Sequence, residues 1–114
     1  MDKQNSGVFL GRWENVLDLE ADFQDGSVLD YNIIVACYDG GEYDGECAVL
    51  CEKDGQLFET SSGHCSCNGL EGTFEPQPVT QEYLKMRFEM PSPFPSDIEN
   101  EYRAAVKRWL ENQQ

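Results

Sequence analysis

The residues best suited to chemistry fall in one short stretch, residues 63–72, which contains the single histidine and two of the five cysteines. His64, Cys65 and Cys67 lie within four positions, and imidazole with thiolate is the ligand set that zinc prefers. A Cys-x-Cys pair can reach one ion. The spacing therefore raises a zinc site at His64, Cys65 and Cys67 as one hypothesis, with ordinary loop thiols as the alternative.

A closed zinc site needs a fourth ligand, which Cys37, Cys47 or Cys51 would have to supply across the sheet. Cys47 and Cys51 are four residues apart, so on one extended strand their Cα atoms are roughly 13 Å apart and cannot share an ion. His64 and its neighbour Cys65 also project in different directions, which makes them a poor nucleophile–base pair. We therefore predict no cofactor and no catalytic residue, and keep zinc as the alternative.

The second feature that bears on function is acidity. The chain has 114 residues, 22 acidic and 8 basic side chains, and a formal net charge of −14. Carboxylates repel phosphate, so direct binding to nucleic acid is not expected, whereas a basic protein surface would attract the chain. The alternative is a solvated acidic surface with no partner. The residues predicted to bind a partner are Asp18, Glu20, Asp22, Asp39, Glu42 and Asp44.

The sequence gives no sign of membrane insertion or secretion. No apolar run approaches the ~20 residues that span a bilayer. Residues 1–6 are polar and lack the basic flank and apolar centre of a secretion signal. We therefore expect a cytoplasmic protein with reduced thiols, and five cysteines also argue against a complete set of disulfides.

Three strands are predicted in the middle of the chain, at residues 31–38, 46–53 and 56–60. The first is rich in β-branched residues with apolar side chains on both faces, as in an interior strand. Asp54-Gly55 between the second and third is a strong hairpin signal. Residues 73–75 are the candidate for a further short strand. These segments predict an antiparallel meander of three to four strands.

Two helices are predicted after the meander. Thr80 is a plausible N-cap for residues 81–89, which would bury Tyr83, Leu84 and Phe88 or Met86. A proline-rich connector at residues 90–95 leads to the last helix, where Ser96 and Glu99 form a capping box. That helix is amphipathic, and the apolar residues that recur at helical spacing are Ile98, Tyr102, Ala105, Val106, Trp109 and Leu110.

Residues 13–23 remain ambiguous, because their apolar positions fit one face of a helix while residues 17–23 alternate as a half-buried strand does. The whole pattern predicts the α+β class: one domain over residues 1–114, with the meander packed by the C-terminal amphipathic helix.

Residues 31–84 resemble a set of small uncharacterised proteins encoded by bacteriophages and prophages. The resemblance rests on Ile33-Ile34-Val35-Ala36-Cys37-Tyr38, on Glu52-Lys53-Asp54-Gly55-Gln56-Leu57-Phe58-Glu59, and on His64-Cys65-Ser66-Cys67-Asn68-Gly69-Leu70-Glu71-Gly72. It implies a phage origin rather than a mechanism.

Together, charge and resemblance predict a non-enzymatic interaction protein of phage type. It would bind and block a basic, nucleic-acid-binding surface of a host protein, as an anti-CRISPR or other anti-defence inhibitor does. The alternative is a small zinc-binding or thiol-dependent protein centred on His64, Cys65 and Cys67.

Overall fold

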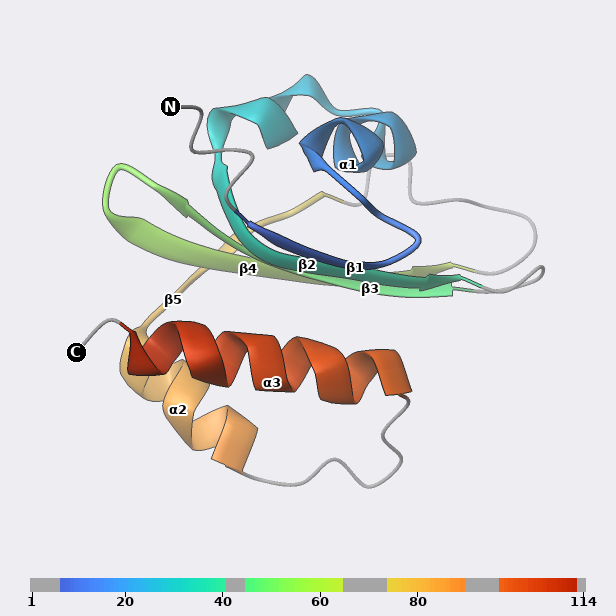
Figure 1. The fold of residues 1–114 in the computed structure, drawn as a ribbon. Helices are drawn as coiled ribbons and strands as arrows, with labels where there is room; N and C mark the ends of the chain where they lie inside the picture. Colours follow the sequence, from blue (N-terminus) through green and yellow to red (C-terminus); the bar gives the residue numbers. More distant parts are fainter. Residues whose placement is uncertain (1–6, 41–44, 65–73, 90–96, 113–114) are drawn as a thin grey trace.

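The computed structural model describes residues 7–40, 45–64, 74–89 and 97–112. They form one sheet with helical elements on both of its faces (Figure 1). The strands are β1 (Val8–Gly11), β2 (Asn32–Gly40), β3 (Gly45–Lys53), β4 (Gln56–His64) and β5 (Gln77–Val79). The helices are α1 (Val16–Phe23), the 3₁₀-helix η2 (Gly26–Asp30), α2 (Gln81–Glu89) and α3 (Asp97–Glu111). No helix in the described ranges is long and apolar enough to cross a membrane.

The five strands lie in chain order, with β1 parallel to β2 and the other neighbouring pairs antiparallel. The α+β class is confirmed, including the C-terminal helix packed on a mostly antiparallel sheet. The predicted meander of three to four strands corresponds to β2 through β5, and β1 adds a parallel fifth strand. A parallel neighbour requires a crossover connection, which α1 and η2 supply.

The hairpin between β3 and β4 forms where it was predicted. Asp54 has φ 53° and Gly55 has φ 82°, and two central residues with positive φ define the turn whose twist matches a two-residue hairpin. The turn sets the register, in which Lys53 pairs with Gln56 and the ladder continues to Gly45 opposite His64.

The predicted strand at residues 73–75 is wrong for Phe74 and Glu75, while Thr73 lies outside the described ranges. Phe74 is buried in the core, and the backbone N–H of Glu75 donates to Thr60 Oγ1 at 3.4 Å. The fifth strand forms later, at Gln77–Val79, and contains Pro78. Proline is tolerated there because β5 is an edge strand.

The ambiguous segment at residues 13–23 is helical from Val16 onward. Asn15 starts α1, because its side-chain oxygen accepts hydrogen bonds from the backbone N–H of Leu17 at 2.9 Å and of Asp18 at 3.2 Å. A strand would have placed Leu17 and Leu19 on one side, whereas Leu17 is 60% exposed and Leu19 is fully buried. The residues that α1 buries are Val16, Leu19 and Phe23.

Helices α2 and α3 form as predicted, with one error in burial. Thr80 Oγ1 accepts from the N–H of Tyr83 at 3.1 Å, which confirms the cap of α2. Leu84 and Phe88 are buried, but Tyr83 is 43% and Met86 is 61% exposed, because residues four apart share the inner face of so short a helix. In α3, the residues buried as predicted are Tyr102, Ala105, Val106 and Leu110, and Trp109 is half-buried. The connector at 90–95, Ser96 and the side chain of Ile98 lie outside the described ranges.

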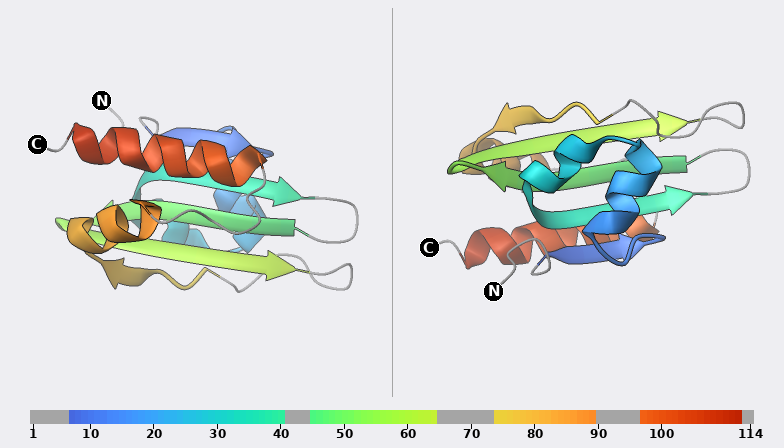
Figure 2. Two further views of the ribbon diagram at one scale, coloured as in Figure 1. Left: turned by 90° about the horizontal axis from the view of Figure 1, so that it is seen from below. Right: turned by 90° about the horizontal axis from the view of Figure 1, so that it is seen from above.

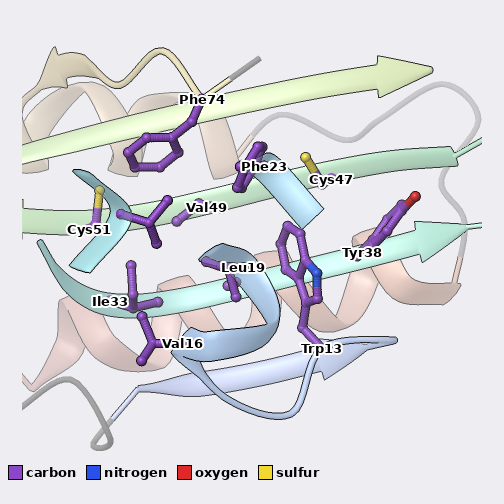
Figure 3. Packing of buried hydrophobic residues seen from close by; sticks show 12 residues of the cluster. Trp13, Val16, Leu19, Phe23, Ile33, Tyr38, Cys47, Val49, Cys51 and Phe74 are labelled. Atoms are coloured by element: carbon purple, nitrogen blue, oxygen red, sulfur yellow. The ribbon is translucent and has the colours of Figure 1, made fainter. Parts of the chain in front are cut away.

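The sheet separates two hydrophobic cores. Figure 3 shows the α1-side core, in which Trp13 packs against Phe23 and Tyr38 at ring-centroid distances of 5.6 and 5.2 Å. α2 and α3 cover the opposite face of the sheet (Figure 2), and the α3-side core lies between them and the strands. A bulge in β2 places both Ile34 and Val35 in the α3-side core. This explains the apolar residues on both faces of the predicted interior strand.

Candidate functional site

One face of the sheet is covered by a layer rich in carboxylates, which we call the acidic layer. It consists of α1, η2 and their flanking residues, which together span residues 13–31 and lie on the face opposite α2 and α3 (Figures 1 and 2). This segment contains no lysine or arginine. All of its carboxylates are exposed or half-buried. They are Glu14, Asp18, Glu20, Asp22, Asp25 and Asp30.

Two of the helical carboxylates also hold the layer together. Asp22 Oδ2 accepts a hydrogen bond from the indole N–H of Trp13 at 2.7 Å, which fixes the buried ring. Asp18 Oδ2 accepts from the backbone N–H of Glu14 at 2.7 Å, next to the start of α1 where negative charge is favoured by the helix dipole. Asp18 and Asp22 are four residues apart and share one side of α1, while Glu20 lies on the other side.

Asp25 anchors the next turn. Its Oδ1 accepts from the backbone N–H of Ser27 at 2.9 Å and from the hydroxyl of Ser27 at 2.6 Å. The side-chain hydrogen bond and then the backbone one lower the pKa of Asp25, because both favour the ionised carboxylate. Asp25 therefore carries its negative charge at neutral pH.

An apolar side chain lies among these charges. Leu17 is 60% exposed on the outer side of α1, while the inner side of the same helix fills the α1-side core. An exposed leucine by itself is common on protein surfaces. Here its position gives the acidic layer one apolar contact point within a charged surround, a combination found at protein–protein interfaces.

The structure brings together three of the six predicted partner-binding residues. Asp18, Glu20 and Asp22 lie in the acidic layer, whereas Asp39 is exposed near the end of β2 and pairs with Glu46 of β3. Tyr38 belongs to the α1-side core. Its neighbour Asp39 therefore points to the α3 side.

The other two predicted residues, Glu42 and Asp44, lie outside the described ranges. The layer also includes Glu14, Asp25 and Asp30, which the predicted set omitted. The signal that could have found them is the lack of any basic residue between Arg12 and Lys53.

The opposite layer differs in charge. Five of the eight basic residues lie in α2 and α3, where acidic residues are interspersed with them. They are Lys85, Arg87, Arg103, Lys107 and Arg108. The fold therefore places six carboxylates on the α1 side, where Arg12 and Lys53 lie against the Tyr38 and Tyr31 rings, and a mixture of charges on the α3 side.

The structure describes only part of the predicted zinc site. His64 is the last residue of β4 and its backbone pairs with Gly45, but its side chain, Cys65 and Cys67 lie outside the described ranges. In the ranges that are described, no three His, Cys, Asp or Glu residues gather closely enough to hold a metal ion. The zinc site at His64, Cys65 and Cys67 therefore stays a prediction.

The three cysteines of the described ranges are buried and are divided between the two faces of the sheet. Cys37 belongs to the α3-side core, and Cys47 and Cys51 belong to the α1-side core. Burial raises the pKa of Cys37 and of Cys51 to about 12. Because the thiolate is the reactive form, these two thiols are poor nucleophiles in the folded protein.

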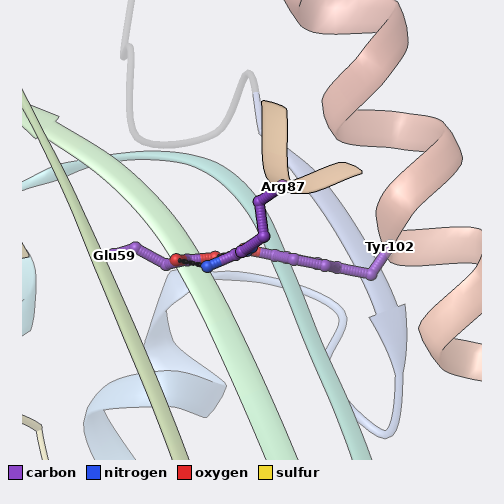
Figure 4. Close-up of polar contacts among 3 residues, drawn as sticks. All are labelled: Glu59, Arg87 and Tyr102. Carbon is purple, nitrogen blue, oxygen red and sulfur yellow. Dashed lines mark hydrogen bonds and ion pairs between the residues drawn. The ribbon is translucent and has the colours of Figure 1, made fainter. Parts of the chain in front are cut away.

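A buried polar network holds α2 and α3 on the sheet (Figure 4). Arg87 of α2 forms a two-pronged ion pair with Glu59 of β4, and the Tyr102 hydroxyl of α3 donates to Glu59 Oε2 at 3.0 Å. Burial disfavours the charged form of Arg87, but hydrogen bonding and attraction from Glu59 outweigh it and raise its pKa. Burial, followed by the Glu59 charge, raises the pKa of Tyr102 well above its usual value, so Tyr102 stays a neutral donor. Because each charge is matched, we interpret the network as structural.

The fold and the surface together define a small acidic α+β domain with one strongly negative helical face. No protein-family model matches the chain, and no match was found among the curated proteins or among the solved structures. The resemblance to phage proteins therefore stays a prediction, and function has to be argued from the surface itself.

Proposed function

We propose that this protein is a small acidic interaction protein whose acidic layer binds a basic, nucleic-acid-binding surface of another protein and blocks it without catalysis. The observation that carries the proposal is the acidic layer itself. It holds six carboxylates and no cation over residues 13–31, gathered on one face of the sheet. The resemblance to phage proteins suggests a host defence enzyme, such as a nuclease or a CRISPR complex, as the partner.

Charge sets the type of partner. With a formal net charge of −14, the protein repels polyanions and is drawn toward surfaces that bind them. Each exposed ion pair contributes only ~0.2–1 kcal/mol and is screened by salt. The acidic layer would therefore accelerate association and exclude unsuitable partners more than it would raise affinity.

Leu17 would supply the apolar part of the contact. Complete burial of a leucine side chain contributes about 1.5–3 kcal/mol, and 60% of Leu17 remains to be covered. The partner surface we propose is therefore basic at its rim and has an apolar depression near its centre.

A matched pair of charge-reversal variants tests the proposal. The first variant changes three acidic-layer residues whose side chains take no part in the hydrogen bonds of the Asp18, Asp22 and Asp25 carboxylates: Glu14→Lys, Glu20→Lys and Asp30→Lys. The control changes three exposed carboxylates of the opposite layer: Glu82→Lys, Glu89→Lys and Glu101→Lys. Both variants alter the net charge equally, so a difference between them reports the location of the charge.

Each variant is used to capture proteins from a host lysate at low and high salt, and a captured protein is then titrated with labelled duplex DNA. We expect the wild type and the control to retain the same basic protein at low salt, to lose it at high salt, and to displace its DNA. The acidic-layer variant should neither retain this protein at low salt nor displace its DNA. Equal loss of capture in both variants would show that only the net charge matters and not its location. Capture without DNA displacement would refute blocking of a nucleic-acid site.

The alternative function centred on His64, Cys65 and Cys67 receives no additional support from the described residues. It stays a prediction from the sequence, and metal analysis of the purified protein tests it.

A further inference from the structure

The two edges of the sheet differ in their capacity to pair with another strand. β5 is three residues long and has Pro78 at its centre, and a proline on an edge strand hinders further pairing because it has no N–H to donate. β1, at the other edge, contains no proline, and β2 is its neighbour in the sheet order. Val8, its first residue, is 44% exposed.

The hydrogen bonds to β2 determine which backbone groups of β1 remain available. The N–H of Arg12 donates to the carbonyl of Tyr38 at 3.0 Å. The backbone groups of successive residues in a strand point alternately to its two sides. The backbone N–H and C=O groups of Val8 and Leu10 therefore also point toward β2. The N–H and C=O groups of Phe9 therefore point outward.

The residue classes along this edge are symmetric about Phe9. Gly7-Val8-Phe9-Leu10-Gly11 is glycine, aliphatic, phenylalanine, aliphatic, glycine. Two antiparallel copies related by a twofold axis at Phe9 would place Phe9 opposite the second Phe9, and Val8 opposite the second Leu10. The chemistry of the edge is thus complementary to itself, as a twofold interface requires.

The side chains lie on the faces that such pairing needs. Phe9 packs against the α1-side core and Leu10 against the α3-side core. Val8 borders an open groove of about 280 Å³ between the start of the sheet and α3, which Trp109 and Arg108 also line. A Leu10 side chain from a second copy would cover Val8 there. The outward groups of the two Phe9 residues would exchange two backbone hydrogen bonds.

We propose that β1 pairs antiparallel with β1 of a second copy, about a twofold axis at Phe9, so that the two five-stranded sheets become continuous. The axis stands perpendicular to the sheet, so both acidic layers lie on the same side of the dimer and double the negative face. Two short strands make a small interface, and each chain carries a net charge of −14. We therefore expect a dissociation constant of roughly 10–100 μM that decreases as salt screens the repulsion.

Sedimentation of the full chain from micromolar to millimolar concentration, at about 0.05 and about 0.5 M salt, tests the proposal. Val8→Lys places a charge opposite Leu10 of the other copy and should raise the dissociation constant roughly tenfold or more. Met86→Lys is the matched control, because it charges an exposed apolar residue of α2, outside both proposed contact surfaces, and it should dimerise like the wild type.

Amide hydrogen exchange of the wild type gives a second readout that does not depend on a variant. The amide of Phe9 should become more protected as the protein concentration rises, whereas exchange in α2 should not change. A chain that stays monomeric at the higher salt concentration would overturn the proposal, as would a dimer that Val8→Lys leaves intact. Protection of Phe9 that appears only with a different protein would assign the edge to that partner instead. Because salt strengthens this contact and weakens the proposed partner binding, the two proposals fail independently.

Discussion

Replacing Arg87 by methionine tests how strongly the buried network holds α2 and α3 on the sheet. Glu59 has 10% of its side chain exposed and Arg87 has 34%. Methionine keeps an apolar stem next to the Phe88 ring, whose centroid lies 4.3 Å from the guanidinium carbon, but it leaves the Glu59 carboxylate without its cation. Removing one partner of a buried pair costs ~3–5 kcal/mol. Because Arg87 is one-third exposed, solvent screening reduces this, and we expect a loss of about 2–3 kcal/mol.

Urea unfolding at neutral pH measures this loss as a lower midpoint at unchanged slope. Lys85→Met, at an exposed position of the same helix, should change the free energy of unfolding by less than about 0.5 kcal/mol. The combined variant Glu59→Leu, Arg87→Met and Tyr102→Phe removes all three polar groups of the network, so it should be more stable than Arg87→Met alone. A structural role for the network is refuted if Arg87→Met behaves like Lys85→Met, or if the combined variant is the least stable.

Two further predictions concern the cysteines. The pKa of Cys37 and of Cys51 is raised by burial to about 12 from an ordinary 9.0, so the unfolded chain ionises first; stability should be fully present below about pH 9 and fall as the pH rises from there toward about 12, less steeply in a variant with alanine at both positions. Metal analysis of freshly purified protein should find no stoichiometric zinc, and chelation should leave partner capture unchanged. Zinc that is lost in Cys65→Ser or Cys67→Ser would instead favour the zinc-binding alternative.

The sequence predicted the elements whose signals are local. β3 follows from the apolar run at residues 47–51, and the Asp54-Gly55 turn signal predicts the return of the chain as β4. α2 follows from the Thr80 cap, and α3 from a long amphipathic repeat. Each of these features is decided within a few residues, so a single sequence is sufficient to find it.

Features that depend on distant residues were not predictable. Val8–Gly11 becomes a strand only because β2, much later in the chain, offers a parallel partner. Glu59 is 28 residues from Arg87 and 43 from Tyr102, so no local pattern indicates their network. Residues 13–23 fit two periodicities, and the Asn15 cap together with packing of Leu19 on the sheet favoured the helix.

In the candidate site, too, local sequence determines some features and contacts between distant residues determine others. Proximity in the sequence grouped Asp39 with the acidic residues before it, but alternation along β2 turns Asp39 toward the α3 side. Conversely, the crossover from β1 to β2 gathers Glu14, Asp25 and Asp30 onto one face with the three helical carboxylates. The acidic character could be predicted from composition, whereas its concentration on one face is a property of the topology.

That concentration is itself an argument for function. Like charges held close together destabilise a folded domain, and surfaces generally mix both signs to avoid this. α2 and α3 follow the general pattern, since their acidic and basic residues are interspersed. The acidic layer does not, although Asp18, Asp22 and Asp25 offset part of the repulsion through hydrogen bonds to backbone, indole and hydroxyl donors. The side chains of Glu14, Glu20 and Asp30 take no part in those hydrogen bonds. Repulsion that no structural contact offsets is characteristic of a surface kept for binding.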